Sequence, residues 1–154
     1  MTSRTFTTQE VAAAIGDTTT RRVAGWCERH VLTPIDDSPG TGVARRFDYA
    51  EVVKAGIFAA AQDRFGEQFL PHLLWVPLKV LHPHDPRDRV WPRFVAPSGT
   101  MPLYIIIDAD QPDRTDFWWP TPKEPVATLN DLGRVALVVN VDAVKAKIEA
   151  NLAK

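Results

Sequence analysis

The chain has 154 residues, 45% of them hydrophobic, and a net charge of −1, which suits the core of one domain or two small ones. No apolar run is long enough to span a bilayer, and the first residues lack the apolar stretch of a signal peptide. The only cysteine is Cys27, which excludes an internal disulfide, and we expect a cytoplasmic protein. Because the net charge is near zero, any nucleic-acid surface must come from where the basic residues lie.

A capping box and a hydrophobic staple mark the start of the first predicted helix, residues 8–15. Thr7 and Glu10 have the spacing of the capping box, in which each side chain binds the backbone amide of the other residue. Phe6 precedes the cap and can pack on Val11 as the staple. A glycine follows the range directly, as expected at a helix end.

The same two signals recur before another predicted helix, residues 49–64. Asp48 and Glu51 repeat the spacing of the capping box, and Phe47 can pack on Val52. A glycine again follows the range.

Between these helices, residues 18–32 predict a helix with two distinct faces, capped by Thr18 or Thr19. At about 100° per residue, one face collects Val23, Trp26, Cys27 and His30. The opposite face collects Arg21, Arg22, Gly25, Glu28 and Arg29. We expect Trp26 and Cys27 to be core residues. The first two helices and the short turn between them then form a helix-turn-helix.

After this helix, two short extended segments flank a tip rich in proline and glycine. The segments lie between residues 31 and 47, and their pattern is typical of a hairpin. In a helix-turn-helix protein this is the position of a wing.

Three pieces of residues 5–64 together resemble known DNA-binding domains. Residues 6–16 resemble the opening of MerR-like and excisionase-like winged helix-turn-helix domains. Residues 22–34 resemble their recognition helix, with its tryptophan and its leucine–proline exit into the wing. Residues 42–52 are similar to the basic and aromatic return of the wing into the third helix.

The resemblance implies that the second helix and the wing contact double-stranded DNA. Arginine pairs with guanine bidentately and neutralises phosphate. The chain departs from the families at Ala24 and Gly25, where they often carry basic residues, and at Asp36 and Asp37. The DNA-binding residues that the resemblance implies are Thr19, Thr20, Arg21, Arg22, Gly25 and Arg29 on the helix, with Arg45 and Arg46 on the wing.

Proline becomes frequent after residue 70, which predicts a boundary between a winged helix-turn-helix domain, 1–66, and a second domain, 67–154. The second domain is predicted to be a small α+β unit of about three strands and a C-terminal helix capped by Asp142. The whole chain is therefore predicted to be α+β. The predicted strands and helix of the second domain are residues 103–107, 116–119, 135–141 and 143–152.

Other patterns of chemically active residues are weaker. His82, His84 and Asp85 lack the spacing of a zinc site, and we expect no metal. The aspartates after the first of these strands are typical turn formers. No phosphate-binding loop or catalytic motif is present, so we expect neither an enzyme nor a cofactor. Trp118 and Trp119 point to opposite sides of a strand, which leaves open a core role and an interface or ligand pocket.

The main hypothesis is a bacterial or phage-type transcriptional regulator that forms a homodimer through its C-terminal half. One alternative is an excisionase-like architectural factor of a mobile element. Another is an adaptor, for example an antitoxin-like module, in which the helix-turn-helix binds protein; the near-neutral charge favours it. The second half could also bind a small-molecule effector, RNA polymerase or a phage protein.

Overall fold

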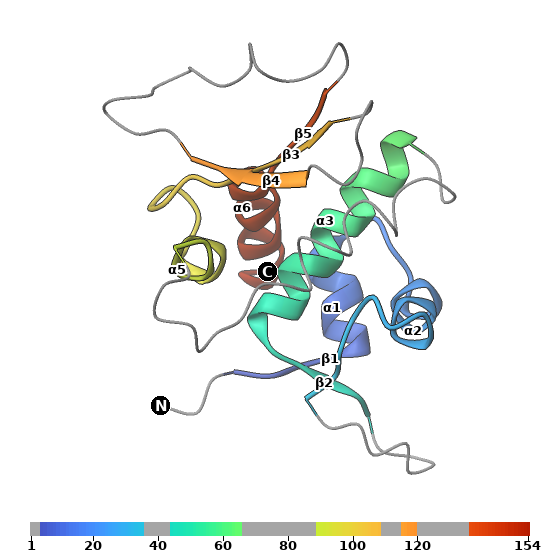
Figure 1. Cartoon of the computed structure of the whole chain (residues 1–154). Coiled ribbons are helices and arrows are strands. Elements are labelled where there is room, and N and C mark those ends of the chain that lie inside the picture. Colours follow the sequence, from blue (N-terminus) through green and yellow to red (C-terminus); the bar gives the residue numbers. More distant parts are fainter. Residues whose placement is uncertain (1–3, 36–43, 66–88, 109–114, 120–135) are drawn as a thin grey trace.

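The computed structural model describes residues 4–35, 44–65, 89–108, 115–119 and 136–154. These residues form helices and two small antiparallel sheets, so the predicted α+β class is confirmed (Figure 1). The first half contains β1 (Phe6–Thr7), α1 (Thr8–Ile15), α2 (Thr20–Glu28), β2 (Arg46–Phe47) and α3 (Tyr49–Phe65). The second half contains α5 (Trp91–Val95), β3 (Tyr104–Asp108), β4 (Thr115–Trp118), β5 (Ala136–Asn140) and α6 (Val141–Leu152). None of the helices in these ranges is long and apolar enough to cross a membrane.

Helix α1 begins and ends as its sequence predicts. The Thr7 side chain accepts a hydrogen bond from the Glu10 amide at 3.2 Å, and the Glu10 carboxylate accepts one from the Thr7 amide at 2.7 Å. This is the predicted capping box. Gly16 ends the helix with φ of 87°, a left-handed conformation that glycine adopts without steric cost.

The start of α3 follows the prediction only in part. Asp48 accepts from the Glu51 amide at 2.8 Å, as an N-cap should. The Glu51 carboxylate does not return to the cap; it accepts from the Thr33 amide at 2.9 Å and pairs with Lys54 at 2.6 Å. The prediction of a reciprocal capping box is therefore wrong, because a loop amide from another part of the chain occupies the carboxylate.

Helix α2 starts after the Thr19 cap, whose hydroxyl accepts from the Arg22 amide at 3.2 Å. The predicted inner face is confirmed for Val23, Trp26 and Cys27, which are all buried. It is wrong for His30, because the helix ends at Glu28 and His30 is exposed, with φ of 56°.

The end of α2 shows why the periodicity stops there. The amide of His30 bonds the Cys27 carbonyl at 3.0 Å, and the amide of Val31 bonds the Trp26 carbonyl at 2.8 Å. This is the hydrogen-bond pattern of a Schellman motif, with histidine at the left-handed position that glycine usually occupies. Val31 and Leu32 are then buried in place of His30.

The segment predicted to be a hairpin lies partly outside the described residues, which omit 36–43. Within the described part, β2 pairs antiparallel with β1, with Phe6 opposite Phe47 and Thr7 opposite Arg46. The Ile35 amide donates to the Arg46 carbonyl at 2.8 Å. Residues before and after the tip are thus joined, and β1 adds a further strand that the sequence did not predict.

The second sheet has the order β4-β3-β5, with both pairings antiparallel. The strands predicted at residues 103–107 and 116–119 are confirmed as β3 and β4, which pair with each other. Ile105 lies opposite Phe117 on one side and Val139 on the other, and both Ile105 and Val139 are buried. Helix α6 lies against this sheet (Figure 1).

Asn140, rather than Asp142, caps α6. Its side chain accepts from the Ala143 amide at 3.0 Å. Asp142 is wrong as the predicted cap because both its carboxylate oxygens have other partners. One accepts from the Gly99 amide at 2.9 Å, and the other pairs with Lys145 at 3.2 Å.

Helix α6 also packs closely on α1 and α3. A β-carbon added at Gly56 of α3 would lie 2.8 Å from Val144 and 2.9 Å from Ile148, so only glycine permits this approach. Asn151 of α6 donates to the carbonyl of Ala14, in the last turn of α1, at 3.0 Å.

The apolar core includes residues from both halves of the chain, among them Trp26 and Phe58 together with Leu103, Ile105 and Ile148. The division into domains at 1–66 and 67–154 stays a prediction, and the core is continuous across it. His82, His84, Asp85 and the wing-tip aspartates lie outside the described residues.

Candidate functional site

Helix α2 presents part of its predicted basic face to solvent. It lies at the edge of the molecule, well away from α6 and the three-stranded sheet (Figure 1). Arg21 and Arg29 are exposed. Arg29 folds back along the helix, where its Nε donates to the Gly25 carbonyl at 3.2 Å. Among the described residues, Arg21 has no ion-pair or hydrogen-bond partner for its side chain.

Arg22, by contrast, is engaged inside the protein. Its Nε donates to the Gln62 side chain at 3.0 Å, and its Nη1 lies 3.5 Å from the Asp63 carboxylate. The guanidinium carbon also lies 5.7 Å from the centre of the Trp26 ring. The structure thus separates Arg22 from the other arginines of α2, which the helical projection could not do.

The remaining predicted residues on α2 lie at its exposed start and middle. Thr19 and Thr20 are exposed, and the Thr19 hydroxyl is occupied by the cap. At Gly25 an added β-carbon would meet only the Arg29 side chain, at 3.9 Å, so the surface above this glycine is open. Glu28 is exposed on the same helix and reduces the positive charge of this face.

Arg45 and Arg46 have different surroundings. Arg45 is half-buried and lies near enough to the Cys27 thiol of α2 to lower its pKa. Burial raises the pKa of that thiol, although Arg45 acts in the opposite direction, so Cys27 is a neutral core residue. Arg46 is exposed, opposite Thr7 in the β1–β2 pair. Arg45 thus lies near α2, directly before β2 begins.

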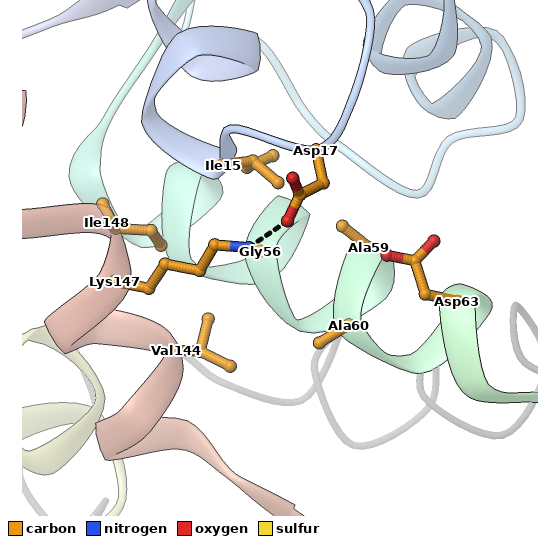
Figure 2. Close-up of a pocket in the computed structure, with 9 residues that line it drawn as sticks. All are labelled: Ile15, Asp17, Gly56, Ala59, Ala60, Asp63, Val144, Lys147 and Ile148. Carbon is orange, nitrogen blue, oxygen red and sulfur yellow. Dashed lines mark hydrogen bonds and ion pairs between the residues drawn. The ribbon is translucent and has the colours of Figure 1, made fainter. Parts of the chain in front are cut away.

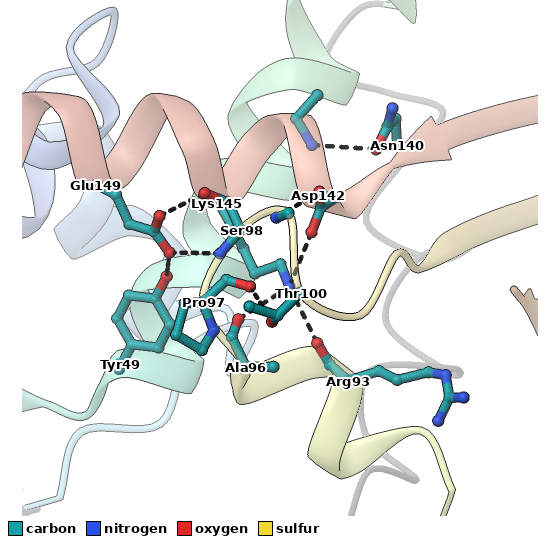
Figure 3. A network of polar contacts seen from close by, with 12 residues as sticks. Tyr49, Arg93, Ala96, Pro97, Ser98, Thr100, Asn140, Asp142, Lys145 and Glu149 are labelled. Atoms are coloured by element: carbon teal, nitrogen blue, oxygen red, sulfur yellow. Dashed lines mark hydrogen bonds and ion pairs between the residues drawn. The ribbon is translucent and has the colours of Figure 1, made fainter.

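A second polar cluster lies between α6, α3 and the loop after α5 (Figure 3). Lys145 is fully buried and donates to the carbonyls of Arg93 at 3.0 Å and Ala96 at 2.9 Å, besides its ion pair with Asp142. The partners of this ammonium group therefore all lie within the fold.

The same cluster contains a carboxylate that is held in its charged form. Glu149 accepts from the Tyr49 hydroxyl at 3.0 Å and from the Ser98 amide at 2.9 Å. Burial alone would raise the pKa of Glu149, but the hydrogen bonds from Ser98 and Tyr49 outweigh it and the net pKa is lowered. Burial and the neighbouring carboxylate raise the pKa of Tyr49. Their contacts join α3, α6 and the loop after α5.

A hollow of about 50 Å³ lies between the end of α1, α3 and α6 (Figure 2). Its apolar lining includes Gly56, Val144 and Ile148, and Lys147 of α6 pairs with Asp17 beside it. A hollow of this size is much smaller than a typical small-molecule site. It is a gap between packed helices, which the described parts of the chain leave partly open.

The tryptophan pair lies at the end of β4. Trp118 belongs to β4, and Trp119 directly follows it. Trp119 is half-buried, and the Arg93 guanidinium of α5 lies 4.5 Å from the centre of its ring. This contact gives Trp119 a cation–π partner within the fold.

The arginines on α2 and β2 include exposed groups that point away from the protein. In the cluster around Lys145 and Glu149, the charged groups bind other parts of the fold. Comparison of the sequence with protein-family models gives no match, and comparison with curated proteins gives none either. The functional argument therefore rests on the geometry of this surface. Sequence reasoning missed Gln62 and Asp63, because nothing in the pattern of α3 indicates which residue of α2 they face.

Proposed function

We propose that the chain is a sequence-specific, double-stranded-DNA-binding transcriptional regulator, in which residues 5–64 form a winged helix-turn-helix. One observation carries the proposal. Helix α2 buries Val23 and Trp26 on one face while Arg21 and Arg29 stand in solvent on the other, at an edge of the molecule that α6 leaves uncovered. A helix of this kind fits the width of the major groove.

In this proposal α2 is the recognition helix, and its start approaches the DNA. Arg21 and Arg29 reach base edges or phosphates, while Thr20 and the exposed backbone amides near Thr19 bind phosphate. The space above Gly25 lets the DNA approach the helix closely, since no side chain stands there apart from Arg29.

The wing contributes through Arg46, which is exposed at the base of the hairpin segment. Arg45 lies behind the wing, near Cys27. The wing then touches the DNA backbone beside the groove that α2 occupies.

The regulator is proposed to act as a homodimer through its C-terminal half. Two recognition helices related by a two-fold axis would read half-sites separated by about one helical turn, near 10 bp. The position of α2 is compatible with this arrangement, because the described part of the C-terminal half does not cover it (Figure 1).

The test begins with selection of a duplex from a random pool, followed by fluorescence anisotropy over a salt series. Arg21→Gln, Arg29→Gln and Arg46→Gln should each weaken binding, by about 1–3 kcal/mol where the residue reads a base. Each variant that removes a phosphate contact should also lower the salt slope by about one. Arg89→Gln, the same change at an exposed position in the second half of the chain, is the matched control and should bind as the unmodified protein does. Failure to select any duplex bound more tightly than about 1 μM, the level of non-specific binding, would contradict the proposal.

A protein-binding adaptor is the second candidate. The net charge of −1 and the acidic Glu28 beside the arginines favour it. Affinity purification from a lysate, with and without nuclease, separates the two proposals. A partner protein retained after nuclease treatment, together with no selected duplex, would establish the adaptor.

A further inference from the structure

We propose that Arg22 does not contact DNA but sets the angle of α2 against α3, and so positions the exposed arginines for sequence-specific binding. The inference rests on the proposed DNA-binding function and assigns Arg22 a role different from that of Arg21 and Arg29. It makes Arg22 a positioning residue, with Gln62 as its essential partner.

The first step of the argument is the contact with Gln62. The Gln62 side chain belongs to α3, and the residue is only 4% exposed, yet its carbonyl oxygen has a donor, the Arg22 Nε at 3.0 Å. A buried amide oxygen without a donor is destabilising, because it has lost its hydrogen bonds to water and gained none in return. If Arg22 turned outward to reach DNA, it would leave this oxygen unpaired, so the contact favours the inward position.

The second step is that the Arg22 guanidinium group has several partners within the protein. Nε binds Gln62, Nη1 lies 3.5 Å from the Asp63 carboxylate, and the guanidinium carbon lies 5.7 Å from the Trp26 ring centre. Asp63 is itself 52% exposed, so its ion pair is the weaker contact. Hydrogen bond, ion pair and ring contact all draw the group toward α3 and the core side of α2.

The third step is geometric. Helix α2 meets α3 at two places one helical turn apart. At one of them the Trp26 and Phe58 rings pack with centroids 6.5 Å apart, and at the other Arg22 binds Gln62. Helix α2 also packs on α1, and the two contacts one turn apart add a constraint on its direction relative to α3. The Arg22 amide also donates to the Thr19 cap, so the same residue fixes the start of α2.

The consequence concerns specificity more than affinity. Phosphate contacts tolerate small shifts of a helix, but contacts with base edges require a defined direction in the groove. A helix that swings keeps its charge near DNA and loses discrimination between sequences.

The experiment removes the partner and leaves the arginine in place. Gln62→Met keeps a buried side chain of similar size and the full charge of Arg22. We expect the ratio of affinities for the selected duplex and a random duplex to fall by about tenfold, the size of one lost base contact. Binding to the random duplex and the salt slope should stay unchanged, because no phosphate contact is removed.

Two further variants serve as controls. Gln62→Glu retains an acceptor for Arg22 and should restore the discrimination ratio. Asp63→Asn removes only the exposed, weaker contact and should change the ratio by less than Gln62→Met does. All affinities are measured where circular dichroism shows each variant fully folded, so a general loss of stability does not affect the ratio.

The outcomes distinguish this inference from the function on which it rests. If the unmodified protein selects no duplex, the DNA-binding proposal fails and this inference fails with it. If the protein binds a selected duplex but Gln62→Met discriminates as well as the unmodified protein, only the positioning role is overturned. A salt slope lowered by about one in Arg22→Gln, with no effect of Gln62→Met, would make Arg22 a direct DNA contact.

Discussion

The arginines of α2 and the charged residues around α6 are treated differently by the fold. Arg21 stands in solvent, whereas Lys145 is completely buried and binds two backbone carbonyls and a carboxylate. Arg22 lies between these extremes, with one buried partner and one exposed partner. The comparison shows that charge alone does not identify a binding surface, because the fold itself uses the buried charges.

The largest loss of stability is expected when Lys145, the fully buried charge, is replaced. Lys145→Met removes the ammonium group and leaves two carbonyls and one oxygen of the Asp142 carboxylate without the donor that Lys145 supplies. We expect the free energy of unfolding to fall by about 3 kcal/mol, the usual cost of breaking a buried ion pair. Urea unfolding followed by circular dichroism measures it. Lys147→Met, at an exposed position on the same helix, should change far less. Equal effects of the two variants would show that burial does not distinguish these charges.

The second largest loss of stability is expected at Gly56, where α3 packs closely against α6. Gly56→Ala places a β-carbon within 3 Å of Val144 and Ile148. We expect a loss of about 1–2 kcal/mol, because overpacking outweighs the gain in helix propensity. Thermal unfolding measures the change. A variant at least as stable as the unmodified protein would mean that α6 moves away from α3 without cost.

The same type of substitution, glycine to alanine, should raise the stability of the protein when it is made at Gly25 of α2. At Gly25 the added β-carbon meets only the flexible Arg29 side chain, at 3.9 Å. Gly25→Ala should therefore stabilise the protein by about 0.5–1 kcal/mol through helix propensity. Thermal unfolding beside Gly56→Ala tests the pair directly. Destabilisation by Gly25→Ala would indicate that α2 is less open than described.

The smallest effect depends on pH. Hydrogen bonds from Ser98 and Tyr49 hold the pKa of Glu149 below its usual value of 4.5, despite burial. Its contribution to stability is therefore fully present above pH 4.5 and is lost as the pH falls through the lowered pKa. Unfolding free energies of Glu149→Gln should depend less on pH across this acid range than those of the unmodified protein. Identical acid profiles for the two proteins would contradict the assignment.

The sequence predicted the helices of the first half well because their signals are local. A capping box and a terminal glycine act within a few positions, as Thr7, Glu10 and Gly16 show for α1. The prediction failed at His30 because the helical periodicity was continued beyond Glu28, where α2 ends. It also failed where a nearby residue supplied the cap instead, as Asn140 does for α6.

The candidate site was predictable as a face but not residue by residue. Helical projection placed Arg21, Arg22 and Arg29 together, and all three lie on one helix. Whether each guanidinium group is free depends on α3, since the partner of Arg22 lies 40 positions away in the chain. For the same reason the sequence does not distinguish Lys145, which is buried, from Lys147, which is exposed.

The hydrogen bond between Asn151 and the Ala14 carbonyl joins residues 137 positions apart. Contacts of such separation form late, because a long loop has to close before they contribute. A ribosome that has made only the first half of this chain has not yet made the residue that completes the end of α1. The end of α1, which leads into the turn before α2, is therefore completed only once α6 has been synthesised and has docked.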